Sequence, residues 1–380
     1  METLVILGGA TMLFIVVLVN FISILSGFLM LWKVPLAIKG ADNVSVKKTV
    51  SIIIPARNEE NRLPKLLASL SNQSFKPIEV IVVDDESSDR TVAVAKKQGA
   101  KVIKKQKRDE WTGKSAVCWS GANEAKGDWL LFLDADTFFE TKSSLEQLLV
   151  TYQSVGATGI LSFQPFHKIT NWYENLSAVF NIILMAGMNV FTPLGTQIET
   201  AGSFGPCILC EKEEYLIVGG HKAIQGAIMD DLALGEKFRE NNFPVHCYGG
   251  QGLIQFQMYP EGIKQLAEGW TKSFGTAAQS THPIVTGLIS FWISGAFFTF
   301  GSLLVALLAN DTSLLIIASL VCTVYAVQFY WLARRFGQFS LLILFGYPLF
   351  FLFFIGLFVW SLFLTKVLHR VTWSGRKLEV

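Results

Sequence analysis

The sequence has few charged residues: Asp, Glu, Lys and Arg make up 16% of its 380 residues, and the formal net charge is +2. Soluble globular proteins usually contain about 25% charged residues. A chain this close to neutral has no general electrostatic attraction to nucleic acid, so we expect no nucleic-acid partner. The hydrophobic content of 51% also excludes a disordered chain, because disorder requires low hydrophobicity together with high net charge.

Cysteine is scarce as well, and two of the five cysteines, Cys207 and Cys210, have the spacing of half a zinc site. No second pair follows them at ligand spacing, so we interpret both as buried small hydrophobic residues. The glycine-rich fingerprint of dinucleotide-binding folds is also absent after the first predicted strand, where Ala56–Glu60 offers acidic and amide groups instead.

Two regions of the sequence contain almost no charged residues. None lies between Leu4 and Trp32, and only Asp311, Arg334 and Arg335 lie between Ile284 and Thr365. Crossing a bilayer takes about 20 apolar residues. We therefore predict an N-terminal anchor over residues 1–32, a C-terminal membrane region of about three segments over 284–365, and a basic tail over 366–380. The predicted segments are Met12–Leu31, Ile284–Leu308, Leu314–Leu332 and Leu341–Leu364.

The positive-inside rule indicates how the predicted segments are oriented in the membrane. Lys33 and Lys39 follow the first segment, and Arg334 and Arg335 lie between the last two, so both connections are predicted to be cytoplasmic. The basic tail would then lie outside if every segment crossed. A break at Gly346-Tyr347-Pro348 could instead make the last segment re-entrant, and the sequence leaves this alternative open.

Residues 49–283 alternate short apolar strands with helices, which is typical of an α/β fold with a mostly parallel sheet covered by helices. In such sheets, ligands bind beyond the carboxyl ends of the strands. The predicted strands are Val50–Pro55, Glu79–Val83, Ala100–Lys104 and Trp129–Leu133, and the predicted helices are Glu60–Asn72, Asp89–Gln98 and Lys114–Ala125.

Acidic residues follow two of these strands directly. Asp84 and Asp85 follow one strand, and Asp134 and Asp136 follow another. Carboxylates this close together suit Mg²⁺ or Mn²⁺, which bind through one or two carboxylates plus substrate phosphates. The D-x-D pattern is short and alone is equally typical of a solvated turn, but the apolar strand and the second acidic pair favour a metal site.

Other polar residues have two interpretations. Asp230 and Asp231 begin an amphipathic segment, where acids also favour a helix N-terminus electrostatically. Lys114 follows Gly113 at a predicted helix start, a position that suits an anion. We interpret His221 and His246 as structural.

The motifs taken together resemble those of family-2 glycosyltransferases in order and spacing, over roughly Val50 to Ser273. They are Ile53–Glu59, Val83–Asp89, Gly113-Lys114, Asp134-Ala135-Asp136 and Asp230–Leu234, the last resembling the family's E-D-x-x-L element. Further elements resemble the bacterial members that attach glucose to the carboxyl group of the C30 carotenoid acid 4,4′-diaponeurosporenoate, although hopanoid-associated members share the layout. These are Gly205-Pro206, Gly219–Lys222, Tyr259–Gly262, Glu268–Lys272 and Trp373–Arg376.

The resemblance implies a GT-A-like fold, a UDP-sugar donor (UDP-glucose first), a divalent metal and a role for each matching residue. Pro55, Arg57, Glu59 and Asp84 would line the nucleotide pocket, Lys114 would approach the base or diphosphate, Asp134 would face ribose or metal, and Asp136 would hold the metal. Asp231 matches the catalytic base, with Asp230 beside it, and Glu268 and Trp270 would lie on the acceptor side.

The expected function is therefore sugar transfer, with inversion, to a lipophilic acceptor at a bacterial cell membrane. Gln265–Trp270 lacks the arginine of the Q-x-x-R-W element of processive synthases, which argues against polymer synthesis. We interpret residues 172–191 as an amphipathic helix at the membrane interface. A fifth membrane span and simple packing in a protein core remain alternatives for this segment. Transfer to a polyprenyl phosphate or a hopanoid-type lipid, and a non-catalytic membrane scaffold, remain alternatives, and the sequence does not indicate an oligomeric state.

Overall fold

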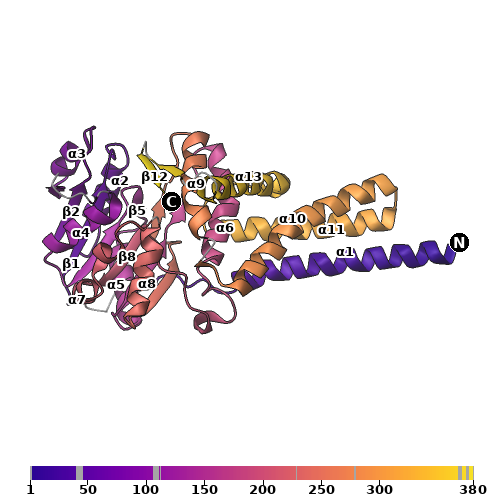
Figure 1. Ribbon diagram of the computed structural model, residues 1–380, viewed down its shortest axis with the longest axis horizontal. Helices are drawn as coiled ribbons and strands as arrows, with labels where there is room; N and C mark the ends of the chain where they lie inside the picture. Colours follow the sequence, from indigo (N-terminus) through magenta and orange to yellow (C-terminus); the bar gives the residue numbers. More distant parts are fainter. Residues whose placement is uncertain are drawn as a thin grey trace. The chain divides into compact units, whose positions relative to one another are not determined.

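The computed structural model describes residues 2–39, 46–105, 111, 113–227, 229–277, 280–366, 370–373 and 376–379. The chain forms two compact units, whose elements are labelled in Figure 1. We call Val34–Lys168 with Thr200–Met258 the sheet unit, and Met1–Lys33 with Ile169–Glu199 and Tyr259–Val380 the helical unit.

Seven strands of the described sheet unit form one sheet in the order β3-β2-β1-β4-β8-β6-β9. The strands β3, β2, β1 and β4 are mutually parallel, β8 is antiparallel to both of its neighbours, and β9 is parallel to β6. The prediction of a mostly parallel sheet is thus confirmed. The bounds are β1 (Val50–Ala56), β2 (Glu79–Asp84), β3 (Lys101–Lys104), β4 (Trp129–Leu133), β6 (Ile160–Gln164), β8 (Cys207–Glu211) and β9 (Val245–Gly249).

Helices cover both faces of this sheet because successive side chains of a strand point to opposite sides. In β1, Ile52 and Ile54 pack with buried residues of α2 and α5, whereas Ile53 packs with buried residues of α4 and α8. The predicted helices are confirmed within two or three residues at their ends. The bounds are α2 (Leu63–Ser71), α3 (Thr91–Lys97), α4 (Lys114–Glu124), α5 (Ser144–Ser154), α7 (Lys212–Ile217) and α8 (Asp230–Glu240).

The carboxyl ends of β1, β2 and β4 meet at one edge of the sheet. Ala56 pairs with Asp84 across β1 and β2, and the parallel pairing of Ile53 with Phe132 brings the end of β4 alongside. The chain after β4 continues into a small sheet of β5 (Thr137–Phe139), β10 (Ile254–Phe256) and β7 (Phe166–His167). The predicted acids therefore lie at a common edge.

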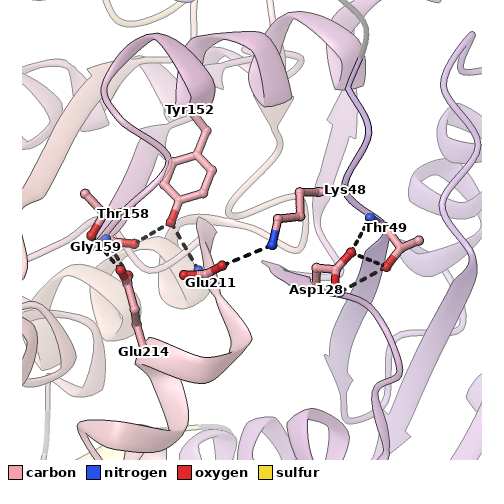
Figure 2. Close-up of polar contacts among 8 residues, drawn as sticks. All are labelled: Lys48, Thr49, Asp128, Tyr152, Thr158, Gly159, Glu211 and Glu214. Carbon is pink, nitrogen blue, oxygen red and sulfur yellow. Dashed lines mark hydrogen bonds and ion pairs between the residues drawn. The ribbon is translucent and has the colours of Figure 1, made fainter.

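A polar network ties strands together at the opposite edge (Figure 2). The Tyr152 hydroxyl donates to the Gly159 carbonyl at 3.0 Å and accepts the Glu211 N–H at 3.1 Å. The Glu214 carboxylate accepts the Thr158 hydroxyl at 2.5 Å and the Gly159 N–H at 2.6 Å. These bonds join α5, β6, β8 and α7 away from the acidic edge. Figure 2 also draws Thr49 and Asp128, whose hydrogen bonds connect the starts of β1 and β4, and Lys48, which pairs with Glu211 at the end of β8.

The helical unit contains α1 (Glu2–Met30), α10 (Pro283–Ala309) and α11 (Thr312–Arg334) side by side (Figure 1). Small residues let their backbones approach closely, as in membrane helix pairs. A Cβ added at Gly295 would lie 2.3 Å from the Cβ of Ser23, and one added at Gly27 would lie 2.7 Å from Trp292. Since Gly27 meets Trp292 and Ser23 meets Gly295, α10 runs antiparallel to α1.

The ends of α1 and α11 lie together. The Gln328 amide donates to the Ile24 carbonyl at 2.6 Å, and the Arg335 guanidinium donates to the Leu31 carbonyl at 2.7 Å. Lys33, which follows α1, therefore lies at the same end of the bundle as Arg335. The positive-inside prediction required these two basic connections to share one side of a membrane.

The last predicted membrane segment is broken at Gly346 into α12 (Leu342–Phe345) and α13 (Tyr347–Lys366). The Tyr347 hydroxyl lies 2.8 Å from Thr299 Oγ1, which is midway along α10. Near the other end of α13, the Ser361 hydroxyl donates to the Thr271 carbonyl in α9 (Ile263–Ala277), the helix that precedes α10. Thus α13 begins beside the middle of α10 and runs toward α9. The side of the membrane on which the tail lies stays a prediction.

Three helices of the described chain are long and apolar enough to cross a membrane: Pro283–Ala309, Thr312–Arg334 and Tyr347–Thr365. Phe14–Met30 of α1 forms a shorter apolar helix among the residues whose side chains are described. Of the predicted basic tail, the described backbone consists of the end of α13, β11 (Arg370–Trp373) and β12 (Arg376–Glu379). The rest of the tail lies outside the described residues.

The segment expected at the membrane interface consists of a 3-10 helix, η1 (Trp172–Ser177), and α6 (Ala178–Ala186). Apart from Leu184, the side chains of α6 are buried within the helical unit. Its Phe180 ring stacks on Trp270 of α9 at a centroid distance of 4.9 Å. The apolar side chains of α6 therefore face protein. A further 3-10 turn, η2 (Gly195–Gln197), follows in this unit.

Candidate functional site

The loops after β1 and β2 hold the first group of predicted residues. Asp84 and Asp85 are buried at the end of β2, and the Asp85 N–H donates to the Ala56 carbonyl at 2.9 Å. The Arg57 guanidinium lies 3.5 Å from the Asp85 carboxylate. Buried charges require such partners. Arg57 therefore lies on the loop after β1 and Asp84 at the end of β2, both at the acidic edge.

Hydrogen bonds lock these two loops to each other. The backbone N–H groups of Asn58, Glu59 and Glu60 donate to side-chain oxygens of the second loop at 3.0, 2.7 and 3.1 Å. The accepting residues, in the same order, are Ser87, Thr91 and Asp89. The polar residues that follow Asp84-Asp85 thus hold the first loop in shape, a role that the sequence analysis did not assign.

Glu59 connects the first loop to the acids after β4. Its carboxylate pairs with the Arg62 guanidinium at 2.7 Å. The pKa of Glu59 is raised to about 7, first by burial and also by the nearby carboxylates of Asp136 and Asp134, against the opposing effect of Arg62. The three carboxylates therefore influence one another through space, with Arg62 as a basic partner that the sequence analysis missed.

The turn after β4 presents Asp134 and Asp136. The Asp134 carbonyl accepts the N–H and the hydroxyl of Thr137 at 3.1 and 2.7 Å, which fixes this turn. Burial and the Asp134 carboxylate raise the pKa of Asp136 to about 7, although Arg62 and Lys114 act in the opposite direction. Negative charge is thus crowded at the end of β4.

Lys114 balances part of this charge. Its ammonium lies 2.6 Å from the Asp134 carboxylate. It begins α4 directly after Gly113, whose φ of 98° is a conformation that favours glycine. Burial alone would lower the pKa of Lys114, but Asp134 and Asp230 outweigh burial and raise that pKa above its usual value. The side chain remains a cation at neutral pH.

Asp231 is held in place at the start of α8. Its carboxylate accepts the backbone N–H groups of Gly205 and of the adjacent Leu232, each at 3.1 Å. Its backbone carbonyl accepts the Ser203 hydroxyl at 2.7 Å. Burial and then the Asp230 carboxylate raise the pKa of Asp231 to about 6, against the effect of Lys114. The group is mainly ionised at neutral pH and can still accept a proton.

One pocket brings together residues from six elements of the sheet unit. Five predicted site residues line it, and five further residues complete its wall. The predicted ones are Pro55, Lys114, Asp134, Asp230 and Asp231; the others are Cys118, Phe132, Gly205, Ile208 and His221. Arg57, Glu59, Asp84 and Asp136 lie at the same edge of the sheet but outside this lining.

Glu268 and Trp270, predicted for the acceptor side, belong to α9 of the helical unit. Glu268 is exposed. Trp270 is buried, and its indole N–H donates to the Ser177 hydroxyl at 3.0 Å while its ring contacts Phe180 and Tyr259. The structure thus gives Trp270 extensive packing contacts within its own unit. Cys207 and Cys210 are free and fully buried, as predicted.

Comparison with known proteins agrees with this arrangement. The model of the family described as Glycosyl transferase family 2 matches residues 51–207. The 4,4′-diaponeurosporenoate glycosyltransferases of Staphylococcus aureus strains USA300 and MRSA252 are each 38% identical over 338 residues, covering 88% of the chain and 89% of each relative. The chain belongs to glycosyl transferase family 2.

A solved structure shows that this family-2 member has the expected GT-A-like fold. The mannosyltransferase of Pyrobaculum calidifontis in complex with GDP-Man and Mn²⁺ matches 90% of the chain and 99% of its own length, with a TM-score of 0.53 and 16% identity. The fold class expected from the sequence is therefore confirmed, both in its α/β sheet with helices and in its long apolar C-terminal helices.

The donor set at the end of β4 fits a divalent metal that arrives with phosphate groups. Among the described residues, no three His, Cys, Asp or Glu side chains are clustered as ready ligands. Mg²⁺ and similar ions usually take only one or two carboxylates and complete their shell with water and phosphate oxygens. Asp134 and Asp136 supply such a pair. A cation there would offset the two effects that raise the pKa of Asp136, burial first and the Asp134 charge second.

Proposed function

We propose that this family-2 member transfers glucose from UDP-glucose, with inversion, to the carboxyl group of a C30 carotenoid acid, 4,4′-diaponeurosporenoate. The observation that carries the proposal is the single pocket lined by the carboxylates of Asp134, Asp230 and Asp231 and by the Lys114 ammonium. The printed name of the Staphylococcus aureus relatives supports this acceptor.

The nucleotide sugar would enter along the ends of β1, β2 and β4. Pro55 lines the pocket, and Arg57 and Asp84 lie on the adjoining loops, where we place the nucleotide. Lys114 would balance the negative diphosphate, since it is a cation at a helix N-terminus, where anions are favoured. Two ion pairs, Glu59 with Arg62 and Asp134 with Lys114, would complete the wall of the nucleotide site.

Asp136 and Asp134 would hold Mg²⁺ or Mn²⁺ at the diphosphate. When bound, such an ion neutralises the charge that develops on the departing diphosphate. The protein's own contribution is the position of Lys114, which places a further positive charge beside Asp134 at 2.6 Å.

Asp231 and Asp230 would serve the acceptor. An acceptor oxygen attacks the anomeric carbon from the face opposite the diphosphate, the bond from that carbon to the diphosphate oxygen breaks, and its electron pair leaves with UDP. This single displacement inverts the anomeric configuration. A hydroxyl acceptor would give its proton to Asp231, whose ionised carboxylate is fixed by two N–H groups. A carboxylic acid, with an ordinary pKa of about 4, is already ionised at neutral pH, so Asp231 would then orient the acceptor.

The membrane part suits an acceptor that dissolves in lipid. The three long apolar helices indicate membrane association, and we place the catalytic region, residues 49–283, on the cytoplasmic side of a bacterial cell membrane. Residues 1–32 would anchor the chain and residues 284–365 would form the C-terminal membrane region. Exposed Glu268 on α9 would act on the acceptor side, and Trp270 would support that helix by packing.

Release of UDP tests catalysis against the scaffold alternative. The full chain in lipid nanodiscs, with UDP-glucose, Mn²⁺ and the C30 acid, should release UDP and form a glucosyl ester of inverted configuration, read by NMR. Asp136→Asn should abolish this release, whereas Asp128→Asn, a matched change at the far edge of the sheet, should leave it intact. Absence of release with every lipid acceptor would support the scaffold. Release only with polyprenyl phosphate or a hopanoid-type lipid would refute the carotenoid acceptor.

A further inference from the structure

His221, which the sequence analysis assigned to structure, lies in the wall of the pocket. It belongs to the 3-10 helix η3 (Gly220–Ile224) and lines the same pocket as Lys114, Asp230 and Asp231. Its side chain is only 3% exposed. His221 is therefore a nearly buried part of the pocket wall.

The Tyr215 hydroxyl fixes the imidazole ring. It lies 2.9 Å from His221 Nδ1 and accepts the His221 backbone N–H at 3.1 Å. Its own proton can be donated to Nδ1, and we assign the bond in that direction. A neutral imidazole has one donor and one acceptor nitrogen, so an accepting Nδ1 leaves the proton on Nε2. Tyr215 is itself fixed, because Gly220 lies so close that an added Cβ would come within 2.3 Å of Cζ.

The imidazole is uncharged at neutral pH. Burial lowers the pKa of His221 to about 4; the nearby Asp230 raises it and Lys114 lowers it. Within the described residues, the hydrogen bonds of His221 use its backbone N–H and Nδ1, not Nε2. The Nε2–H at the pocket wall can therefore donate to a ligand.

We infer that His221 donates a hydrogen bond from Nε2 to a hydroxyl group of the sugar that is transferred, an inference that rests on the proposed function. The adjacent carboxylates of Asp230 and Asp231 would repel an anionic oxygen. A hydroxyl instead accepts from Nε2–H and can donate its own proton to a carboxylate. The Nε2–H donor and the neighbouring carboxylate acceptors therefore match a sugar hydroxyl. His221 thus recognises the sugar rather than the nucleotide.

Comparing the affinities for UDP-glucose and for UDP distinguishes loss of the His221–sugar contact from a general structural effect of the substitution. By calorimetry on the full chain with Mn²⁺, His221→Phe should weaken UDP-glucose binding about 2–12-fold, the range for one neutral hydrogen bond. UDP, which lacks the sugar, should bind as it does to the wild type. His221→Gln keeps an N–H donor and should recover part of the loss. Equal weakening of UDP and UDP-glucose, or no weakening, would overturn the inference.

Monodeoxy analogues of UDP-glucose identify the hydroxyl. Wild type should lose affinity for the analogue that lacks the contacted hydroxyl, and His221→Phe should show no further loss with that analogue, because the two changes remove the same bond. Tyr215→Phe should weaken UDP-glucose binding in the wild-type background but not in the His221→Phe background. Additive losses for every analogue would overturn the contact.

These outcomes are distinct from failure of the proposed function. A protein that binds UDP-glucose with the His221 dependence described here, yet transfers no glucose, would refute the function and uphold the contact. A protein that transfers glucose equally well with and without the imidazole, at equal affinity for UDP-glucose, would uphold the function and refute the contact. No binding of UDP-glucose to wild type would overturn both.

Discussion

Replacing Asp231 by Asn should affect two classes of acceptor very differently. The substitution preserves the size of the side chain and one oxygen that can accept from Gly205, so the pocket should keep its shape. It removes the capacity to accept a proton. General base catalysis typically contributes about 10²–10⁴-fold. Transfer to an alcohol should therefore fall by that factor, whereas transfer to an acid that is already ionised should fall by less than about tenfold.

The pH dependence of wild-type turnover should also differ between alcohol and acid acceptors. With a pKa of about 6, Asp231 is mostly ionised at pH 7 and becomes protonated as the pH falls through 6. Each pH unit below the pKa reduces the ionised fraction about tenfold. Turnover of an alcohol should decline correspondingly below pH 6. Protonation of Asp136, whose pKa is about 7, should lower both activities alike. The ratio of alcohol to acid turnover should therefore fall about tenfold per pH unit below pH 6, because only the alcohol needs Asp231 as a base.

The assay compares the C30 carotenoid acid with the corresponding C30 alcohol, using labelled UDP-glucose and the full chain in nanodiscs. Asp128→Asn serves as control, because it makes the same chemical change at the opposite edge of the sheet, where Asp128 accepts from Thr49. The control should leave both rates unchanged. An equal loss of both activities in Asp231→Asn would refute the assignment of Asp231 as a base needed only for the alcohol.

Three further substitutions test the geometry. In Gly205→Ala the new Cβ would lie 2.8 Å from the Asp231 carboxylate, so turnover should fall about 10–100-fold through misplacement with little change in melting temperature; unchanged turnover would contradict this. Lys114→Met should raise the KM for UDP-glucose about tenfold or more, whereas Lys101→Met, which breaks the ion pairs of Lys101 with Glu79 and Glu124, should not; similar effects of both would count against the assignment. Tyr152→Phe leaves two backbone groups without a partner and should lower the free energy of unfolding by about 1–3 kcal/mol in chemical denaturation, and a change below about 0.5 kcal/mol would exclude this role.

The sheet and its acidic edge were predictable because they rest on local patterns. Apolar strands ended by acids, such as the one before Asp134, indicate both the strand and the end at which a ligand binds. The same logic placed Lys114 at a helix start and Asp231 at another, and the structure brings these residues into one pocket.

Other features depended on contacts between distant residues. Arg62 has no motif of its own, and its pairing with Glu59 follows from the turn between β1 and α2. His221 resembled a packing residue because nothing local shows that Tyr215 directs its ring toward the pocket. The break at Gly346 was visible in the sequence, but only the Tyr347 contact with Thr299 shows that α13 begins midway along the bundle.

The identity of the glucosylated lipid decides whether this chain transfers glucose to a carotenoid acid. Membranes containing the full chain would be incubated with UDP-glucose labelled in the sugar, Mn²⁺ and a total lipid extract supplemented with the C30 carotenoid acid, and the labelled lipid would be identified by mass spectrometry. The account predicts one glucose joined to the carotenoid carboxyl group as an ester, and no labelled lipid with Asp136→Asn. Labelled glucose on a different lipid, or equal labelling by wild type and Asp136→Asn, would contradict it.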